Sequence, residues 1–172
     1  MAIEIERKFL LTDEGWRPQV RHSQRMRQAY LAGPMAGVEG APKCSVRVRV
    51  AGEQAFLNLK SAQLGIERAE YEYAISVQDA EEMIENLAGD CLEKIRHEVI
   101  YEGHVFEIDE FLGHNAGLIV AELELLHRDT IFPRPAWLGV EVSTLARYYN
   151  INLISHPYSR WSASERKADD AC

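Results

Sequence analysis

Three ionisable residues stand two apart near the start of the chain. Glu4, Glu6 and Lys8 alternate with large apolar residues. If this segment is a strand, the three side chains share one face, because successive side chains of a strand point to opposite sides. Two carboxylates beside an ammonium are an unusual choice for a buried face, but they suit a site that holds divalent cations next to an anionic substrate. The spacing therefore predicts metal-assisted chemistry on an anion.

The same spacing of charge recurs along most of the chain. Its later members are Arg47 and Arg49, Lys60, Glu70 and Glu72, Lys94 and Arg96, Glu107 and Asp109, and Glu122 and Glu124. Any sheet with one face in water alternates charged and apolar residues, and that explanation suffices for a single strand. It is weaker for the whole set, because water-facing positions usually include Ser, Thr and Gln, whereas these are nearly all ionised.

Periodicity alone does not distinguish an open sheet with its charged face in water from a closed barrel with that face inside. Inside a barrel, two cations repel each other by about 4 kcal/mol at a separation of ~4 Å and an effective dielectric of about 20. A polyanion or an array of carboxylates relieves this repulsion. Arg and Lys suit the oxygens of linked phosphates, and carboxylates suit Mg²⁺ or Mn²⁺.

The elements that carry these residues are mostly strands. Period-2 alternation predicts strands over residues 3–10, 25–31, 44–50, 55–61, 66–75, 92–101, 104–111 and 118–127. Most of the connections are too short for a parallel crossover, so consecutive strands must be antiparallel. Residues 77–88 are predicted to form a helix, because Ser76 can cap it and Gly89 ends it. Residues 135–139 and 144–154 are expected to form short helices.

Bulk properties limit the class of protein. The 172 residues predict one domain over residues 1–163, followed by a frayed polar tail over 164–172. The net charge of −8 argues against general nucleic-acid binding. No apolar run is long enough for a membrane helix, and acidic residues stand where a signal peptide would be basic, so we expect a cytoplasmic protein. The three cysteines are far apart, which predicts reduced thiols and no zinc site.

The ordered set of charged pairs resembles the CYTH superfamily, the triphosphate tunnel metalloenzymes. This family includes class IV adenylate cyclases, thiamine triphosphatases and bacterial inorganic triphosphatases. The opening Glu4-x-Glu6-x-Lys8 matches the family signature, and the resemblance runs over most of the chain. It implies an α+β, β-dominated fold, in which a closed eight-stranded antiparallel β-barrel (a tunnel) has helices packed outside and a C-terminal plug helix.

The resemblance also implies a role for each site residue. The implied metal ligands for Mg²⁺ or Mn²⁺ are Glu4, Glu6, Asp109, Glu122 and Glu124. The implied substrate-binding residues are Lys8, Arg47, Arg49, Lys60, Lys94, Arg96 and Arg147. Tyr30 resembles a family tyrosine that pairs with the signature lysine near the leaving group, although packing against the core explains a tyrosine there equally well. Glu70 and Glu72 would orient the cationic side chains or an outer-shell water.

The implied reaction is in-line attack of a metal-activated water on the terminal phosphorus of inorganic triphosphate, with Lys8 stabilising or protonating the departing oxygen. The expected partner is this small anion, with no nucleic acid or membrane, and a homodimer is left open. An adenylate cyclase is disfavoured, because the His-Phe element that such members carry before the signature is absent. Thiamine triphosphatase activity stays open. A non-catalytic polyphosphate-binding module is the alternative of another class, and the intact carboxylate set argues against it.

Overall fold

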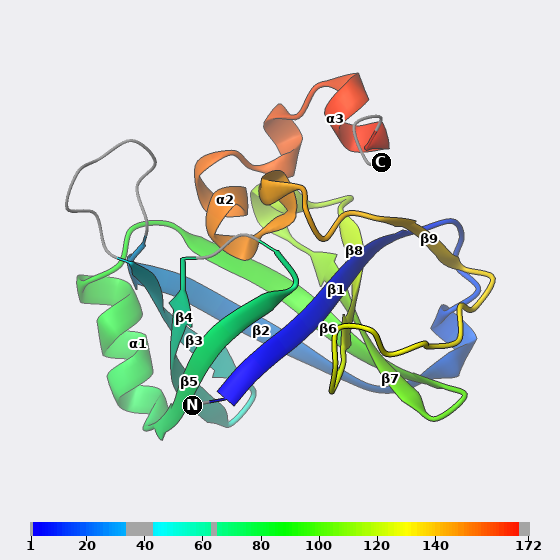
Figure 1. Cartoon of the computed structure of the whole chain (residues 1–172). Coiled ribbons are helices and arrows are strands. Elements are labelled where there is room, and N and C mark those ends of the chain that lie inside the picture. The colour runs from blue at the N-terminus through cyan, green and yellow to red at the C-terminus, as the bar shows by residue number, and fades with distance from the viewer. Residues whose placement is uncertain (1, 34–42, 63–64, 169–172) are drawn as a thin grey trace.

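The alternation of ionised and apolar residues is built into one antiparallel sheet that closes on itself in the computed structural model, which describes residues 2–33, 43–62 and 65–168 (Figure 1). The strands are β1 (Ala2–Leu11), β2 (Val20–Ala32), β3 (Cys44–Ala51), β4 (Gln54–Ser61), β5 (Glu67–Ile75), β6 (Cys91–Tyr101), β7 (His104–Phe111), β8 (Ile119–Glu124) and β9 (Leu138–Glu141). Their order is β5-β4-β3-β2-β6-β7-β8-β1, and pairing of β1 with β5 closes the ring. The predicted eight-stranded barrel is confirmed, and the open sheet is excluded.

Strand β1 forms the seam of the barrel. One edge of β1 pairs with β8 over residues 6–10, while residues 2–5 pair with β5 on the other edge. Further along β1, at residues 9–11, the extra strand β9 pairs with it, and Leu11 lies opposite Leu138. The predicted helix over residues 135–139 is therefore wrong. Gly139 fits this close pairing, because an added Cβ would lie 2.9 Å from the carbonyl oxygen of Leu10.

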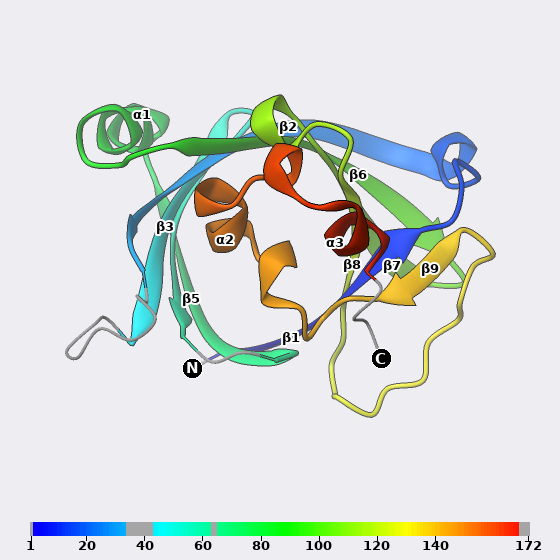
Figure 2. The ribbon, with the colours of Figure 1, turned by 90° about the horizontal axis from the view of Figure 1, so that it is seen from above.

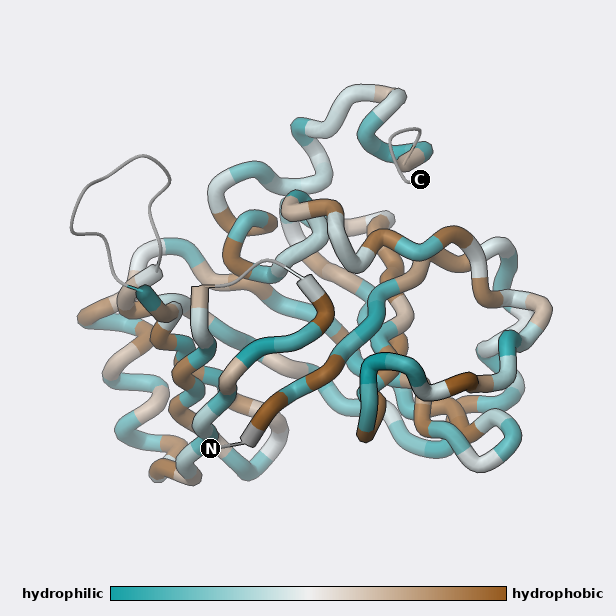
Figure 3. The backbone as a smooth tube through the Cα atoms, viewed as in Figure 1, coloured by the Kyte–Doolittle hydropathy of each residue, from teal (hydrophilic) through white to brown (hydrophobic). Residues whose placement is uncertain are grey.

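Hydrophilic and hydrophobic residues alternate along the strands (Figure 3). The apolar residues lie outside the barrel, where other elements cover them. Phe9, Phe106 and Trp137 belong to a buried cluster on β1, β7 and the chain that leads to β9. On the opposite side, Val48 and Ile84 belong to the cluster under helix α1 (Val77–Asn86). Burying the apolar faces outside leaves the barrel interior to the charged residues.

Helix α1 is the predicted helix outside the barrel, and it packs against β2, β3 and β4. The predicted cap is confirmed, since the Ser76 hydroxyl accepts a hydrogen bond of 2.9 Å from the Asp79 amide. The short helices are η1 (Arg17–Gln19), η2 (Gly113–Asn115), η3 (Ala146–Tyr148), α2 (Asn150–Ser155), η4 (Tyr158–Arg160) and α3 (Ala163–Lys167). Helix α2 lies over one opening of the barrel (Figure 2), which confirms the predicted C-terminal plug.

Two boundaries in particular differ from the predictions. Strand β2 begins at Val20, five positions before the predicted start, in a stretch where exposed polar residues hide the alternation. Residues 163–167 form α3 with a complete capping box between Ser162 and Glu165, so this part of the predicted tail is ordered; residues 169–172 lie outside the described ranges. Across those ranges, no helix combines the length and the apolar content needed to cross a membrane.

Candidate active site

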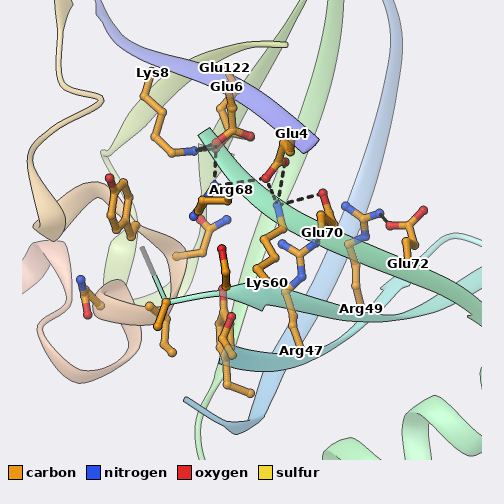
Figure 4. A pocket seen from close by; sticks show the side chains of 18 of the residues that line it. Glu4, Glu6, Lys8, Arg47, Arg49, Lys60, Arg68, Glu70, Glu72 and Glu122 are labelled. Carbon is orange, nitrogen blue, oxygen red and sulfur yellow. Dashed lines mark hydrogen bonds and ion pairs between the residues drawn. The ribbon is translucent and has the colours of Figure 1, made fainter. Parts of the chain in front are cut away.

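The barrel encloses a cavity of about 700 Å³ with a highly charged lining (Figure 4). Its charged and phenolic side chains are Glu4, Glu6, Lys8, Tyr30, Arg47, Arg49, Lys60, Arg68, Glu70, Glu72, Arg96, Glu107, Glu122, Glu124 and Tyr149. Each of the eight barrel strands contributes at least one of them. The ionised faces predicted from alternation therefore converge on one enclosed space, because every strand turns the same face inward.

One part of the interior is a layer of fully paired charges, which we call the deep ion-pair layer. Its members are Lys8, Lys94, Arg96, Asp109 and Glu122. The Arg96 guanidinium donates two hydrogen bonds of 2.7 Å to the Asp109 carboxylate and one of 2.5 Å to Glu122. Lys94 also pairs with Asp109, and Lys8 with Glu122. Asp109 is completely buried, so these pairs replace its hydration.

The pairing fixes the charge states in this layer. Burial raises the pKa of Glu122, but Lys8, Lys94 and Arg96 more than offset it and hold that pKa well below its usual range. Burial lowers the pKa of Lys8, yet Glu122 and Glu6 raise it above its ordinary value. Burial and Arg96 lower the pKa of Lys94 to about 8. Lys8 and Glu122 therefore stay ionised at neutral pH.

A second group of carboxylates, which we call the acidic cluster, consists of Glu4, Glu6, Glu70 and Glu124. Glu124 lies opposite Glu6 in the β1–β8 pairing. Burial and the charges of Glu4, Glu6 and Glu70 raise the pKa of Glu124. Within the described part of the chain, no cation lies within ion-pair distance of its carboxylate. Lys8, Lys60 and Arg68 contact the other three carboxylates, so Glu124 is the member of the cluster whose negative charge the protein leaves unpaired.

Uncompensated carboxylates are the donors that a hard divalent cation takes, so the acidic cluster fits the predicted metal by its chemistry. Lys60 and Arg68 occupy part of the space around Glu4, since Lys60 Nζ lies 2.7 and 2.8 Å from the two Glu4 oxygens. In the described ranges, no three acidic, thiol or imidazole side chains already stand in coordinating positions. The two remaining predicted ligands, Asp109 and Glu122, belong to the deep ion-pair layer.

The wall formed by β3, β4 and β5 presents cations to the cavity. Arg49 Nη2 lies 2.9 Å from Glu72, whereas Arg47 Nη2 lies 4.0 Å from Glu70. The Asn58 amide donates hydrogen bonds to both Glu70 (2.9 Å) and Glu72 (2.6 Å), which fixes these two carboxylates. The Nε atoms of Arg47 and Arg49 have no hydrogen-bond partner in the described structure. These guanidinium groups thus retain donors for an anion.

Some predicted residues lie away from the cavity lining. Lys94 is 1% exposed and sits behind the lining with Asp109. The Arg147 guanidinium lies over the rings of Tyr148 and Trp161, with centroid distances of 5.0 and 5.6 Å, and this placement does not support its predicted contact with substrate. Tyr30 does line the cavity. Burial raises its pKa against the opposing effects of Arg47, Arg68 and Lys8, so the phenol keeps its proton at neutral pH.

Sequence reasoning missed three residues of the interior. Arg68 and Glu107 line the cavity, and Asn58 holds two of its carboxylates. All three share the inward parity of their strands, which was the only available signal. Arg68 and Glu107 were omitted although that signal was present, and Asn58 is neutral and so does not stand out in a charge pattern.

The chain is similar to a known protein family and to individual proteins. A family model described as the CYTH domain matches residues 2–157. A curated protein of Acetivibrio thermocellus named inorganic triphosphatase is 38% identical over 162 residues, which cover 94% of this chain and 99% of that protein. One of Nitrosomonas europaea with the same name is 36% identical over 150 residues, which cover 86% and 93% of the two chains.

Solved structures also resemble this chain. A crystal structure of an inorganic triphosphatase superposes with a TM-score of 0.61 at 34% identity, and the match covers 90% of this chain and 95% of that one. A protein from Pyrococcus horikoshii superposes with a TM-score of 0.55 at 18% identity, over 73% of this chain and 80% of that one. The second match concerns the fold alone.

Proposed function

This chain belongs to the CYTH domain family, and from that premise we propose that it hydrolyses inorganic triphosphate to diphosphate and phosphate. One observation carries the proposal: a cavity of about 700 Å³ inside the barrel, whose wall combines, among the described residues, guanidinium N–H groups that have no hydrogen-bond partner with a cluster of carboxylates in which Glu124 has no cation partner. Both sequence relatives described above carry the name inorganic triphosphatase. A linear triphosphate without an organic group is the substrate that such a wall can contact along its whole length.

The cations of the cavity bind and orient the phosphate chain. Arg47 and Arg49 offer planar donors that suit non-bridging phosphate oxygens, and Lys60 acts as a point charge. Glu70 and Glu72 keep these side chains in place through their own contacts and through Asn58. Preorganised donors of this kind cost little reorganisation when charge develops in the transition state.

Glu4, Glu6 and Glu124 are the residues that would hold the divalent cation, and we propose Mg²⁺ or Mn²⁺ because all three offer carboxylate oxygens. When bound, the cation supplies charge neutralisation on the phosphate oxygens and lowers the pKa of water. A role of Asp109 and Glu122 as further metal ligands stays a prediction, because each of these carboxylates is already paired with two cations in the deep ion-pair layer. In that layer they hold Lys94 and Arg96 in fixed positions.

Lys8 stabilises the departing phosphate oxygen. Its ammonium lies between the two groups of carboxylates, 2.6 Å from Glu6 and paired with Glu122. Because these partners raise its pKa, Lys8 remains a cation at neutral pH and acts mainly through its charge. Tyr30, which Lys8 affects electrostatically, keeps its proton and can donate a hydrogen bond near the same oxygen.

Phosphate release from tripolyphosphate with Mg²⁺ or Mn²⁺ tests the proposal. We expect turnover in the wild-type protein and a loss of roughly a hundredfold in Glu4→Gln, by analogy with the 10- to 100-fold cost of losing even an outer partner of a metal site. Glu85→Gln on the exposed side of α1 is the matched control and should keep full activity. ATP and thiamine triphosphate in the same assay test the other family activities.

Either of two results would overturn the proposal. One is the absence of phosphate release with both metals. The other is full activity in Glu4→Gln, which would exclude a role for the acidic cluster. A cytoplasmic location is also part of the proposal, and the free thiols of Cys44 and Cys91 suit a reducing compartment.

A further inference from the structure

Arg68 is a cavity residue that the catalytic scheme above does not use. It lies on β5 directly opposite Glu4 in the β1–β5 seam. Its Nη2 atom is 3.4 Å from a Glu4 oxygen and 3.4 Å from a Glu6 oxygen, and Figure 4 shows the guanidinium beside both carboxylates. Its Cζ atom lies 5.5 Å from the ring centroid of Tyr149. The side chain is 15% exposed and faces the cavity.

We propose that Arg68 is a built-in counterion, which a divalent cation must displace from Glu4 and Glu6, and that the displaced guanidinium then binds the phosphate chain. This inference rests on the proposed function, because it assigns the two carboxylates to the metal. It adds a residue that couples the occupancy of the metal site to the binding of substrate.

Among the contacts of cations with Glu4 and Glu6 in the described structure, those of Arg68 are the longest, so Arg68 is the counterion most easily displaced from these two carboxylates. Charge-assisted hydrogen bonds between nitrogen and oxygen are normally about 2.7–2.9 Å long. Lys60 reaches Glu4 within that range, and Arg96 reaches Asp109 within it on two atoms. Arg68 instead shares one nitrogen between two carboxylates at 3.4 Å. A cation with shorter contacts to the same oxygens therefore competes with Arg68 first.

Tyr149 gives the displaced side chain a fixed surface on which to remain. Its hydroxyl accepts a hydrogen bond of 3.1 Å from the Gly65 amide and donates one of 2.9 Å to the Ser143 carbonyl. The two hydrogen bonds fix the hydroxyl end of the ring, and its face can retain a guanidinium by a cation–π contact. When Arg68 leaves Glu4 and Glu6, it would stay at the wall of the cavity, where phosphate oxygens can replace the two carboxylates as its partners.

Two opposite effects follow from this arrangement. Removing the Arg68 charge should strengthen the binding of metal in the absence of substrate, because the competitor is gone. The same change should weaken the binding of tripolyphosphate, because a donor is gone. A residue that only supports the fold would not strengthen metal binding when removed.

The test is a titration of the substrate-free protein with Mn²⁺ alone, followed by calorimetry or electron paramagnetic resonance. We expect Arg68→Gln to bind Mn²⁺ about tenfold more tightly than wild type, which corresponds to about 1.4 kcal/mol. Arg49→Gln is the matched control, since it removes the same charge from the same cavity but from a residue paired with Glu72. We expect it to change the affinity by less than about threefold, as a more distant charge.

Further variants keep the proposal testable if Arg68→Gln does not fold. Arg68→Met removes the charge while keeping an unbranched side chain against Tyr149, and it should also bind Mn²⁺ more tightly. Arg68→Lys keeps the charge and should stay within about threefold of wild type. If a folded charge-removing variant gains no more affinity than Arg49→Gln, the counterion role is wrong.

The second half of the proposal is tested by kinetics. We expect Arg68→Gln to raise KM for tripolyphosphate about tenfold at saturating metal, the cost of one charged contact. An unchanged KM would overturn the contact with substrate. If the wild-type protein releases no phosphate at all, the proposed function fails, while the Mn²⁺ titration still decides whether Arg68 competes with metal.

Discussion

The deep ion-pair layer and the acidic cluster are built from the same residue types but differ in how their charges are balanced. In the layer, Asp109 and Glu122 each contact two cations and are almost completely buried. In the cluster, Glu124 is exposed and has only carboxylates as close charged neighbours apart from Lys60. Buried charges must be paired to be tolerated, whereas unpaired charges near solvent are available to a ligand. The deep ion-pair layer therefore stabilises the barrel, and the acidic cluster is the region available to bind a ligand.

The largest effect should come from unbalancing the layer. Asp109→Asn leaves Lys94 and Arg96 without their shared buried partner, and we expect the free energy of unfolding to fall by about 3–5 kcal/mol. Chemical denaturation measures this change. Glu107→Gln is the matched control, because it also removes a partner of Arg96 from β7 but its side chain is 39% exposed. The control should lose at most about 1 kcal/mol. Equal losses in the two variants would contradict the distinction between framework and binding site.

The converse change affects the cluster. Glu124→Gln removes a carboxylate whose pKa is raised by its neighbours, so it relieves repulsion and should leave the melting temperature of the metal-free protein unchanged or higher. We expect tripolyphosphate hydrolysis to fall by roughly a hundredfold, as for loss of a partner in a metal site. Differential scanning calorimetry and a phosphate-release assay measure the two quantities. A variant that loses stability while keeping activity would reverse the roles assigned to the two regions.

The smallest effect concerns Glu165, a carboxylate that accepts several hydrogen bonds but is not buried. Hydrogen bonds from Ser162 and His156 lower the pKa of Glu165, in the capping box of α3, to about 2. Because this pKa lies below its unfolded value, the capping contribution is present above about pH 4.5 and is lost as the pH falls toward 2. An NMR titration of Glu165 in wild type and in Ser162→Ala checks it: the variant should titrate closer to the ordinary value. An ordinary pKa in the wild-type protein would contradict the cap.

Much of this fold could be predicted from alternation, because a closed barrel needs one consistent inward face on every strand. The strand positions followed from that rule, whereas the closure of the barrel, and with it the convergence of Glu4, Arg47 and Glu122, was predicted from the family resemblance. The division of charges between layer and cluster could not be predicted, since it depends on the strand register and on the depth of each residue in the barrel. Arg68 is an example. Its position in the alternation predicted that it faces inward, but its contacts with Glu4 and Glu6 depend on the β1–β5 pairing, which the sequence did not reveal.

Short elements were the other source of error. The four residues of β9 (Leu138–Glu141) offer too little alternation to identify a strand, and a preceding proline favoured a different interpretation. Strand β9 is fixed by β1, with Val142 donating a backbone hydrogen bond of 2.8 Å to the carbonyl of Lys8. Tertiary pairing decided its conformation, not local preference.

The seam also constrains the order in which the molecule can be assembled. Strand β1 leaves the ribosome before the other described strands, yet its neighbour β8 ends only at Glu124. Until those residues have been synthesised, Glu6 and Lys8 belong to a strand that is at most half paired. Such long-range closure is slow and leaves an open edge exposed in the meantime. The earliest residues of the site are thus among the last to reach their working positions.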